Sequence, residues 1–339
     1  MGFTRVFGSC LAVVFLASTG SAADTTPQRE IYIPVEFTSL NSPDYWSNGF
    51  WVGYKRSWTP GHVPEIRTFD RNGKEVIARK PLSLPDAYHT AVHAIAADRD
   101  GEVVVSAEFW RSQGDMAPVL CRMNRAGEVT LMARTESFLG RALAVSPDGG
   151  IWSLGSRIAQ PFEPKKDYEV LERYDASGNL KSRALPRSVF AVKYDPAVIH
   201  DLGEPQVVAS STRAGVMSPG TKVWAELNAS GEVIDRFTIE PPVSNDGALA
   251  ELGRLVMSQD NEVYAFFAVV RRAGSTQPHF YGLYRLNRSA HRWDRVNTTP
   301  GPNFGGLYGI DRDSLIRRMG CCTYGWFPLS PVESASLGR

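Results

Sequence analysis

Arginines at the ends of predicted strands are the first residues of this chain whose types and spacing suggest chemistry. Each follows the second strand of a repeated four-stranded unit. Converging arginines bind carboxylate or phosphate through paired hydrogen bonds and a focused positive field. The sequence therefore predicts a site for an anionic small molecule, glycan or protein partner, formed by Arg56, Arg111, Arg157, Arg213, Arg271 and Arg318. The alternative is that each arginine caps its strand and covers aromatic surface with its head group in water.

Two histidines in the segment AYHTAVHAIAA form a second candidate group. His89 and His93 precede an inner strand, on the same face as the arginines. One of them could act as a general base or a metal ligand, and His93 lies nearer the predicted channel. The alternative is that both are loop or channel-wall histidines with structural partners. No Gly-x-Ser-x-Gly elbow supports a Ser-His-Asp hydrolase.

The cysteines divide into one isolated residue and one adjacent pair. After removal of a leader that contains Cys10, the chain keeps Cys121, Cys321 and Cys322. An oxidising compartment favours disulfides, and a bond requires Cα atoms within about 7 Å. Because Cys121 is predicted in a different repeat unit, the pair forms either a Cys321–Cys322 disulfide or two free thiols. The sequence has no Cys-x-x-Cys motif with a nearby histidine, so nothing indicates a cysteine-bound metal. Its motifs predict neither a cofactor nor an oligomeric state.

Aspartates in the predicted turns have a structural explanation. Asp98, Asp148 and Asp260 each lie in the turn of a predicted hairpin. An Asp side chain bonds its own backbone and tolerates positive φ. Turn chemistry therefore explains these residues better than catalysis does.

The elements that must position the candidate residues are hairpins of two alternating kinds. One kind joins an apolar strand to a Val-rich strand through a turn with Asp and Gly, as in AIAADRDGEVVVSA at 94–107. The other kind recurs every 51 to 59 residues, with turns that open at Asp70, Asn124, Asp175, Asn228 and Asn287. Two hairpins per period make four strands, which is one blade of a β-propeller. A β-sandwich is the alternative, but it gives no reason for the alternation.

Residues 24–339 are predicted to form one all-β domain, a six-bladed β-propeller of four-stranded antiparallel blades. Five repeats are recognisable, and the less regular fourth is expected to carry its first hairpin at 195–203. An open ring would expose sheet edges, so we expect Arg29 to Phe37 to pair with Thr323 to Leu329 and close the ring. Rings of five or seven blades are the alternatives.

Aromatic residues gather near both ends of the chain. Tyr45, Trp46 and Trp51 lie in the first predicted blade, and Tyr324 and Trp326 lie near the C-terminus. Ring closure would bring the two groups together. We expect packing between blades to explain them, with a stacking platform for a sugar or aromatic ligand as the alternative.

Charge and hydropathy bear on the class of function and on the compartment. The chain has 37 Lys and Arg against 36 Asp and Glu, so bulk charge does not support a role at nucleic acids or membrane surfaces. Residues 1–23 combine a basic residue, an apolar run and a small-residue exit, which predicts a cleaved signal peptide. The apolar run is too short to span a bilayer, and no later stretch reaches about 18 apolar residues. The mature protein is therefore expected to be secreted or periplasmic.

The units DRDGEVVV, SPDGGIWSL and SQDNEVYAF resemble those of the six-bladed propellers of the NHL-repeat and gluconolactonase-like superfamily, which includes the streptogramin lyases. The resemblance spans most of 49–319 and concerns architecture. It implies, as the alternative to anion binding, a hydrolase or lyase with His89 or His93 as base and a divalent metal held by acidic and Asn side chains. The family's early Glu-Gly-Pro-type segment has no counterpart, because Glu36 lies in VEFTSL.

Overall fold

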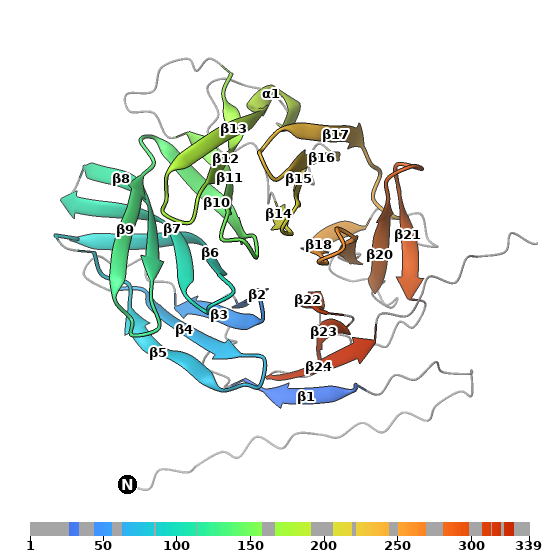
Figure 1. The fold of residues 1–339 in the computed structure, drawn as a ribbon, viewed down its shortest axis with the longest axis horizontal. Helices are drawn as coiled ribbons and strands as arrows, with labels where there is room; N and C mark the ends of the chain where they lie inside the picture. Colours follow the sequence, from blue (N-terminus) through green and yellow to red (C-terminus); the bar gives the residue numbers. More distant parts are fainter. Residues whose placement is uncertain are drawn as a thin grey trace, which may run out of the picture.

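The described part of the chain forms a ring of six β-sheets, each with four antiparallel strands (Figure 1). The structure, a computed structural model, describes residues 27–33, 44–55, 63–84, 86–112, 114–157, 167–190, 206–218, 222–243, 250–268, 281–297, 307–312, 314–319 and 322–328. The chain is a six-bladed β-propeller. The predicted fold class is confirmed, whereas the predicted leader at 1–23 lies outside the described residues.

Five blades are built from consecutive strands, counted from the centre of the ring outward. Blade one is β2 (Asp44–Ser47), β3 (Phe50–Lys55), β4 (Glu65–Asp70) and β5 (Glu75–Pro81). Blade two is β6 (His89–Ala97), β7 (Val103–Ser112), β8 (Asp115–Met123) and β9 (Val129–Arg134). Blade three is β10 (Phe138–Val145), β11 (Ile151–Arg157), β12 (Glu169–Tyr174) and β13 (Leu180–Pro186), followed by the short helix α1 (Arg187–Phe190).

Blade four is β14 (Gln206–Ala209), β15 (Arg213–Ser218), β16 (Val223–Asn228) and β17 (Val233–Thr238). Blade five is β18 (Glu251–Met257), β19 (Val263–Ala268), β20 (Tyr281–Asn287) and β21 (Arg292–Asn297). The prediction for the first hairpin of blade four is wrong, because that hairpin is β14–β15 and not 195–203. Among the described residues, no helix is long and apolar enough to cross a membrane.

Blade six joins the two ends of the chain. Its strands are β22 (Leu307–Asp311), β23 (Ser314–Arg318), β24 (Thr323–Pro328) and, outermost, β1 (Arg29–Tyr32). β1 pairs antiparallel with β24, with Arg29 opposite Trp326 (Figure 1, blue beside red). The predicted closure is confirmed for the described strand.

Turn chemistry explains why the outer hairpins form where they do. Asp175 Oδ1 accepts the backbone N–H groups of Ser177 and Asn179, each at 2.9 Å, and closes the turn between β12 and β13. Gly178 in this turn has a φ of +84°, and a Cβ there would lie 2.7 Å from the Cβ of Met132 in blade two. Glycine is therefore required both by the backbone and by contact with the neighbouring blade.

The core lies between the blades, where each neighbouring pair shares an apolar cluster. At the seam of blades six and one, the Trp51 ring lies 4.1 Å from the Tyr324 ring and 5.0 Å from the Trp46 ring, between centroids. Trp51 and Tyr324 are fully buried. Packing at the closure of the ring therefore explains these two aromatic residues, as predicted.

Candidate functional site

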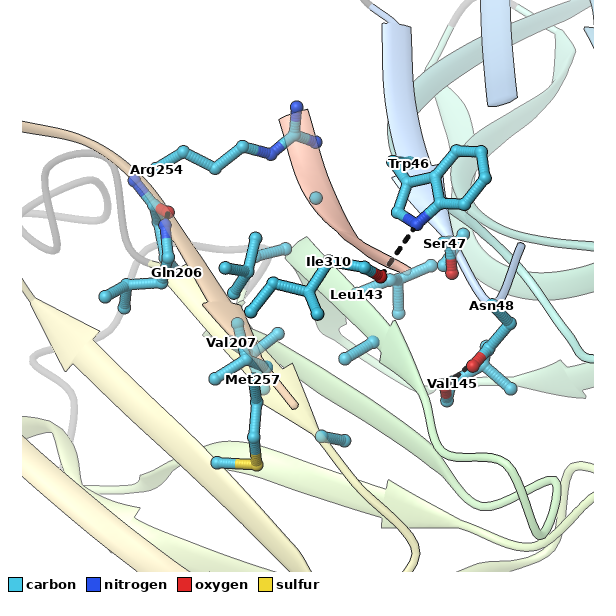
Figure 2. Close-up of a pocket in the computed structure, with 18 of the residues that line it drawn as sticks. Trp46, Ser47, Asn48, Leu143, Val145, Gln206, Val207, Arg254, Met257 and Ile310 are labelled. Atoms are coloured by element: carbon cyan, nitrogen blue, oxygen red, sulfur yellow. Dashed lines mark hydrogen bonds between the residues drawn. The ribbon is translucent and has the colours of Figure 1, made fainter. Parts of the chain in front are cut away.

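A cavity of about 1030 Å³ lies at the centre of the ring. All six inner strands contribute to its wall, and Figure 2 shows part of it. Trp46 Nε1 donates to the carbonyl of Ile310 at 3.1 Å, and Asn48 Nδ2 donates to the carbonyls of Ala97 at 2.9 Å and Val145 at 2.7 Å. These bonds tie inner strands of blades one, two, three and six together, so the cavity has a cross-linked wall.

β-Bulges in the inner strands aim polar side chains at this cavity. The pairing of β6 with β7 skips His93, and the pairing of β10 with β11 skips Arg141. Shifts at a similar place in β18 and β22 skip Gly253 and Tyr308. A bulged residue leaves the in-and-out alternation of its strand, so its side chain can be redirected. Both His93 and Arg141 line the cavity.

His93 lies between a carboxylate and a guanidinium. Its Nε2 is 3.5 Å from Glu108 Oε1, and its Nδ1 is 3.0 Å from Arg141 Nη1. Arginine has only donors, so Nδ1 must accept and the neutral imidazole must carry its proton on Nε2, facing Glu108. The His93 side chain is 9% exposed and that of Glu108 is 16% exposed. The three polar side chains thus form one row, in which His93 and Glu108 are largely shielded from solvent.

The pKa shifts in this row follow from burial and from the neighbouring charges. Burial raises the pKa of Glu108, but the hydrogen-bonding and electrostatic interactions with His93 outweigh it, with smaller contributions from Arg141 and Trp110, so the pKa falls below its usual value. Burial lowers the pKa of Arg141, and the nearby Glu108 opposes that shift in part. Glu108 is therefore the counter-charge that keeps a partly buried arginine at the cavity wall.

Positive charge dominates the wall of the cavity. The described residues that form it include one carboxylate, Asp311, and five arginines, which are Arg71, Arg99, Arg141, Arg254 and Arg312. Asp311 itself lies 3.4 Å from Arg71 Nη2 and accepts from Trp326 Nε1 at 3.1 Å. Arg99 lies 3.8 Å from Asp100, and Arg141 lies near Glu108, so carboxylates just outside the wall offset part of this charge.

The wall also has an apolar part and an unused hydroxyl. Leu143, Val207, Met257 and Ile310 extend into the cavity in Figure 2. Ser156 lines it as well, is 2% exposed, and its Oγ has no hydrogen-bond partner in the described structure. Buried hydroxyls without partners are uncommon, and a bound water or ligand is the usual explanation.

The predicted arginines lie away from this cavity wherever their side chains are described. Arg111 and Arg157 end strands as predicted, but Arg111 pairs with Asp115 at 2.9 Å and Arg157 with Glu172 at 3.3 Å. The position predicted for Arg213 is wrong, because it begins β15 and lies at the opposite end of that strand. Arg56 and Arg271 lie outside the described residues, and Arg318 ends β23 with its side chain undescribed. A role for these arginines in binding a ligand stays a prediction.

The predicted histidines and cysteines have different outcomes. His93 lines the cavity, whereas His89 begins β6, lies opposite Trp110 and is not part of the wall. A catalytic role for either stays a prediction. Cys121 is a buried free thiol in β8, as its predicted separation from the pair requires. Cys321 lies outside the described residues, so the predicted Cys321–Cys322 disulfide stays a prediction.

The metal that the family resemblance implies does not fit the described residues. No group of three or more His, Cys, Asp or Glu side chains lies together in the described part of the chain. The carboxylate of the cavity wall, Asp311, is already engaged by Arg71 and Trp326. Hard divalent cations require several oxygen ligands, whereas the charged side chains of the described wall are five arginines and this single carboxylate.

Comparisons with known proteins give matches among solved structures. No protein-family profile matches the chain, and no curated protein sequence matches it. Among solved structures, hydrazine synthase of Kuenenia stuttgartiensis is 14% identical, with 81% of this chain and 72% of that chain covered and a TM-score of 0.48. A gluconolactonase from Xanthomonas campestris is 14% identical, with 91% and 96% covered and a TM-score of 0.45. A protein of unknown function from Dyadobacter fermentans is 11% identical, with 90% and 99% covered and a TM-score of 0.49.

A gluconolactonase is thus among the structural neighbours. At these identities and TM-scores the likeness assigns no activity and no family to the chain. The strand pairing described above establishes the propeller without it.

Sequence reasoning missed most residues of the cavity wall. A signal was present, since Leu-Gly-Arg occurs in the inner strands of blades three and five, at 139–141 and 252–254. A charged residue in an otherwise apolar inner strand indicates a polar channel. The sequence analysis instead places the candidate arginines at the ends of the second strand of each blade.

Proposed function

We propose that this propeller binds an anionic molecule in its central cavity. The observation that carries the proposal is the excess of arginine over carboxylate in the described cavity wall. The apolar side chains beside those arginines suit a ligand that joins a carboxylate or phosphate group to an apolar part. The unpartnered hydroxyl of Ser156 supports the proposal, because it is a donor that the described protein leaves unused.

Catalysis by His93 is the less supported alternative. A general base needs a ring nitrogen that reaches the substrate. Nδ1 of His93 is bonded to Arg141, and Nε2 is buried 3.5 Å from Glu108 Oε1, with no hydrogen-bond partner in the described structure. The geometry therefore favours binding over a hydrolase or lyase reaction.

Calorimetric titration with sulfate, phosphate and succinate at low ionic strength tests the proposal. We expect Arg141→Gln and Arg254→Gln each to weaken binding about tenfold or more, because each removes a charge-assisted hydrogen bond. Ser156→Ala should weaken binding with little loss of stability. The matched control is Arg134→Gln, an exposed arginine on the outer strand β9, which should bind as the wild type does.

The variants distinguish a binding site in the cavity from one at the strand ends on the rim of the ring. Loss of binding in Arg111→Gln but not in Arg141→Gln would place the site at the strand ends that the sequence analysis proposed. Absence of binding by all three anions, at low salt, would contradict the proposal.

A further inference from the structure

We propose that the cavity takes up one proton with each anion it binds, and that His93 receives this proton. The inference rests on the proposed anion binding and adds its dependence on pH. Three side chains carry it, namely Glu108, His93 and Arg141, which lie in one row at the cavity wall.

In the absence of an anion this row is electrically balanced. The described charged groups that face His93 are Glu108 from β7 and Arg141 from β10. β2 and β3 also pack on β6, and their titratable residues are Asp44, Tyr45, Lys55 and the buried Tyr54. One negative and one positive charge therefore flank a neutral imidazole.

An entering anion competes with His93 for Arg141. An N–H group of Arg141 that donates to Nδ1 of His93 cannot donate fully to the anion as well. Once Arg141 turns to the anion, Nδ1 has lost its donor. The anion adds a negative charge beside Glu108 in this row, and a nearby negative charge favours a protonated imidazole, although other arginines of the wall also lie near the anion.

A proton on Nδ1 resolves both problems at once. His93 then donates from Nδ1 to the anion while Nε2–H still faces Glu108, and each negative charge has a positive neighbour. The proton comes from the solvent, and no covalent bond between heavy atoms forms or breaks. Anion affinity should therefore rise about tenfold for each unit by which the pH is lowered, over the range in which only the complex holds the proton.

Calorimetry with sulfate measures this proton directly, because sulfate keeps its full charge between about pH 6 and about pH 8, the range in which histidine titrates. Titrations in buffers of different ionisation enthalpy should give one proton taken up per sulfate bound. His93→Gln should still bind sulfate through the cavity arginines, but without proton uptake and with an affinity that does not change with pH.

The matched control is His291→Asn, on the exposed turn between β20 and β21, where the ring stacks on Phe237 at 4.1 Å between centroids. Asn tolerates the positive φ of this position, and the variant should keep full proton uptake. Sulfate binding without proton uptake in the wild type, or undiminished uptake in His93→Gln, would overturn the inference and leave the proposed function standing. Failure of the wild type to bind sulfate at any pH would count against both.

Discussion

At the scale of single residues, two buried carboxylates each hold a pair of arginines inside the blades. Glu172 accepts from Arg183 at 2.9 Å and Arg157 at 3.3 Å. Glu226 is fully buried and accepts from Arg213 at 2.5 Å and from Arg288 at 2.7 Å. Because Arg288 belongs to the turn after β20, Glu226 links blade four to blade five.

Replacing Glu226 by Gln should be costly, because it leaves two arginines beside a buried group that has lost its charge. We expect a loss of about 3 kcal/mol in the free energy of unfolding, measured by urea denaturation. Glu240→Gln is the control, since Glu240 is 66% exposed and bonds only to Lys222 among the contacts seen, at 2.5 Å. It should cost less than about 1 kcal/mol. An equal loss of unfolding free energy in the two variants would show that the burial of Glu226 does not increase its contribution to stability.

Cys121 should resist thiol reagents while the protein is folded. Its thiol is fully buried, and this burial raises its pKa to about 12, so the reactive thiolate is scarce at neutral pH. Peptide mapping after treatment with iodoacetamide should find Cys121 unmodified in the native protein and modified in guanidinium chloride. Rapid native labelling would mean that blade two opens readily.

At the scale of elements, the inner strands combine tight pairing with bulges that redirect side chains. Gly155 in β11 illustrates the tight part, because a Cβ there would lie 1.9 Å from the carbonyl oxygen of Leu139 in β10. This contact lies beside the bulge that contains Arg141. The position of Arg141 therefore depends on how closely β10 approaches β11.

We expect Gly155→Ala to push the two strands apart, because a backbone atom cannot move aside as a side chain can. The free energy of unfolding should fall by about 2 kcal/mol, as is typical of overpacking, and sulfate affinity should fall with it. Gly253→Ala is a milder comparison, since the nearest atom to its Cβ would be Phe266 Cδ1 at 3.1 Å. A stable Gly155→Ala variant with unchanged sulfate binding would contradict this account.

Hairpins were predictable from the sequence at this scale, and bulges were not. The residues that open the turns, such as Asp175, can be recognised in the sequence, because their side chains accept hydrogen bonds from the turn backbone. The first hairpin of blade four is predicted at 195–203 and not at β14–β15, because the turn around Ser210 has no Asp or Gly. The sequence indicates His93 near the channel but not Arg141 beside it, since alternation along one strand does not reveal a bulge, which is seen only in the pairing with the next strand.

At the scale of the whole molecule, stability depends on a ring that is closed by pairing the first described strand with the last. Ile33, next to β1, is fully buried, and its N–H donates to the carbonyl of Cys322 at 2.8 Å. The aromatic cluster around Trp51 and Tyr324 covers the same seam. Closure was predictable because an unpaired edge on either side is unfavourable.

Removal of residues 1–33 should therefore leave β24 as an open edge and expose the seam. We expect a lower melting temperature and concentration-dependent aggregation, measured by calorimetry and light scattering. A synthetic peptide of residues 27–33 added in excess should raise the melting temperature, because it can pair with β24. Truncated protein as stable as a chain that lacks only residues 1–23 would show that β1 does not close the ring.

The closure also sets an order of events during synthesis. Residues 29–32 leave the ribosome before blades one to five, and their partners at 323–328 leave it after those blades. At usual rates of translation the first strand waits tens of seconds for its neighbour. Blades one to five have time to form and stack in this interval, while blade six can be completed only once residues 323–328 have been made. This one strand therefore decides whether the five blades before it become part of a closed ring.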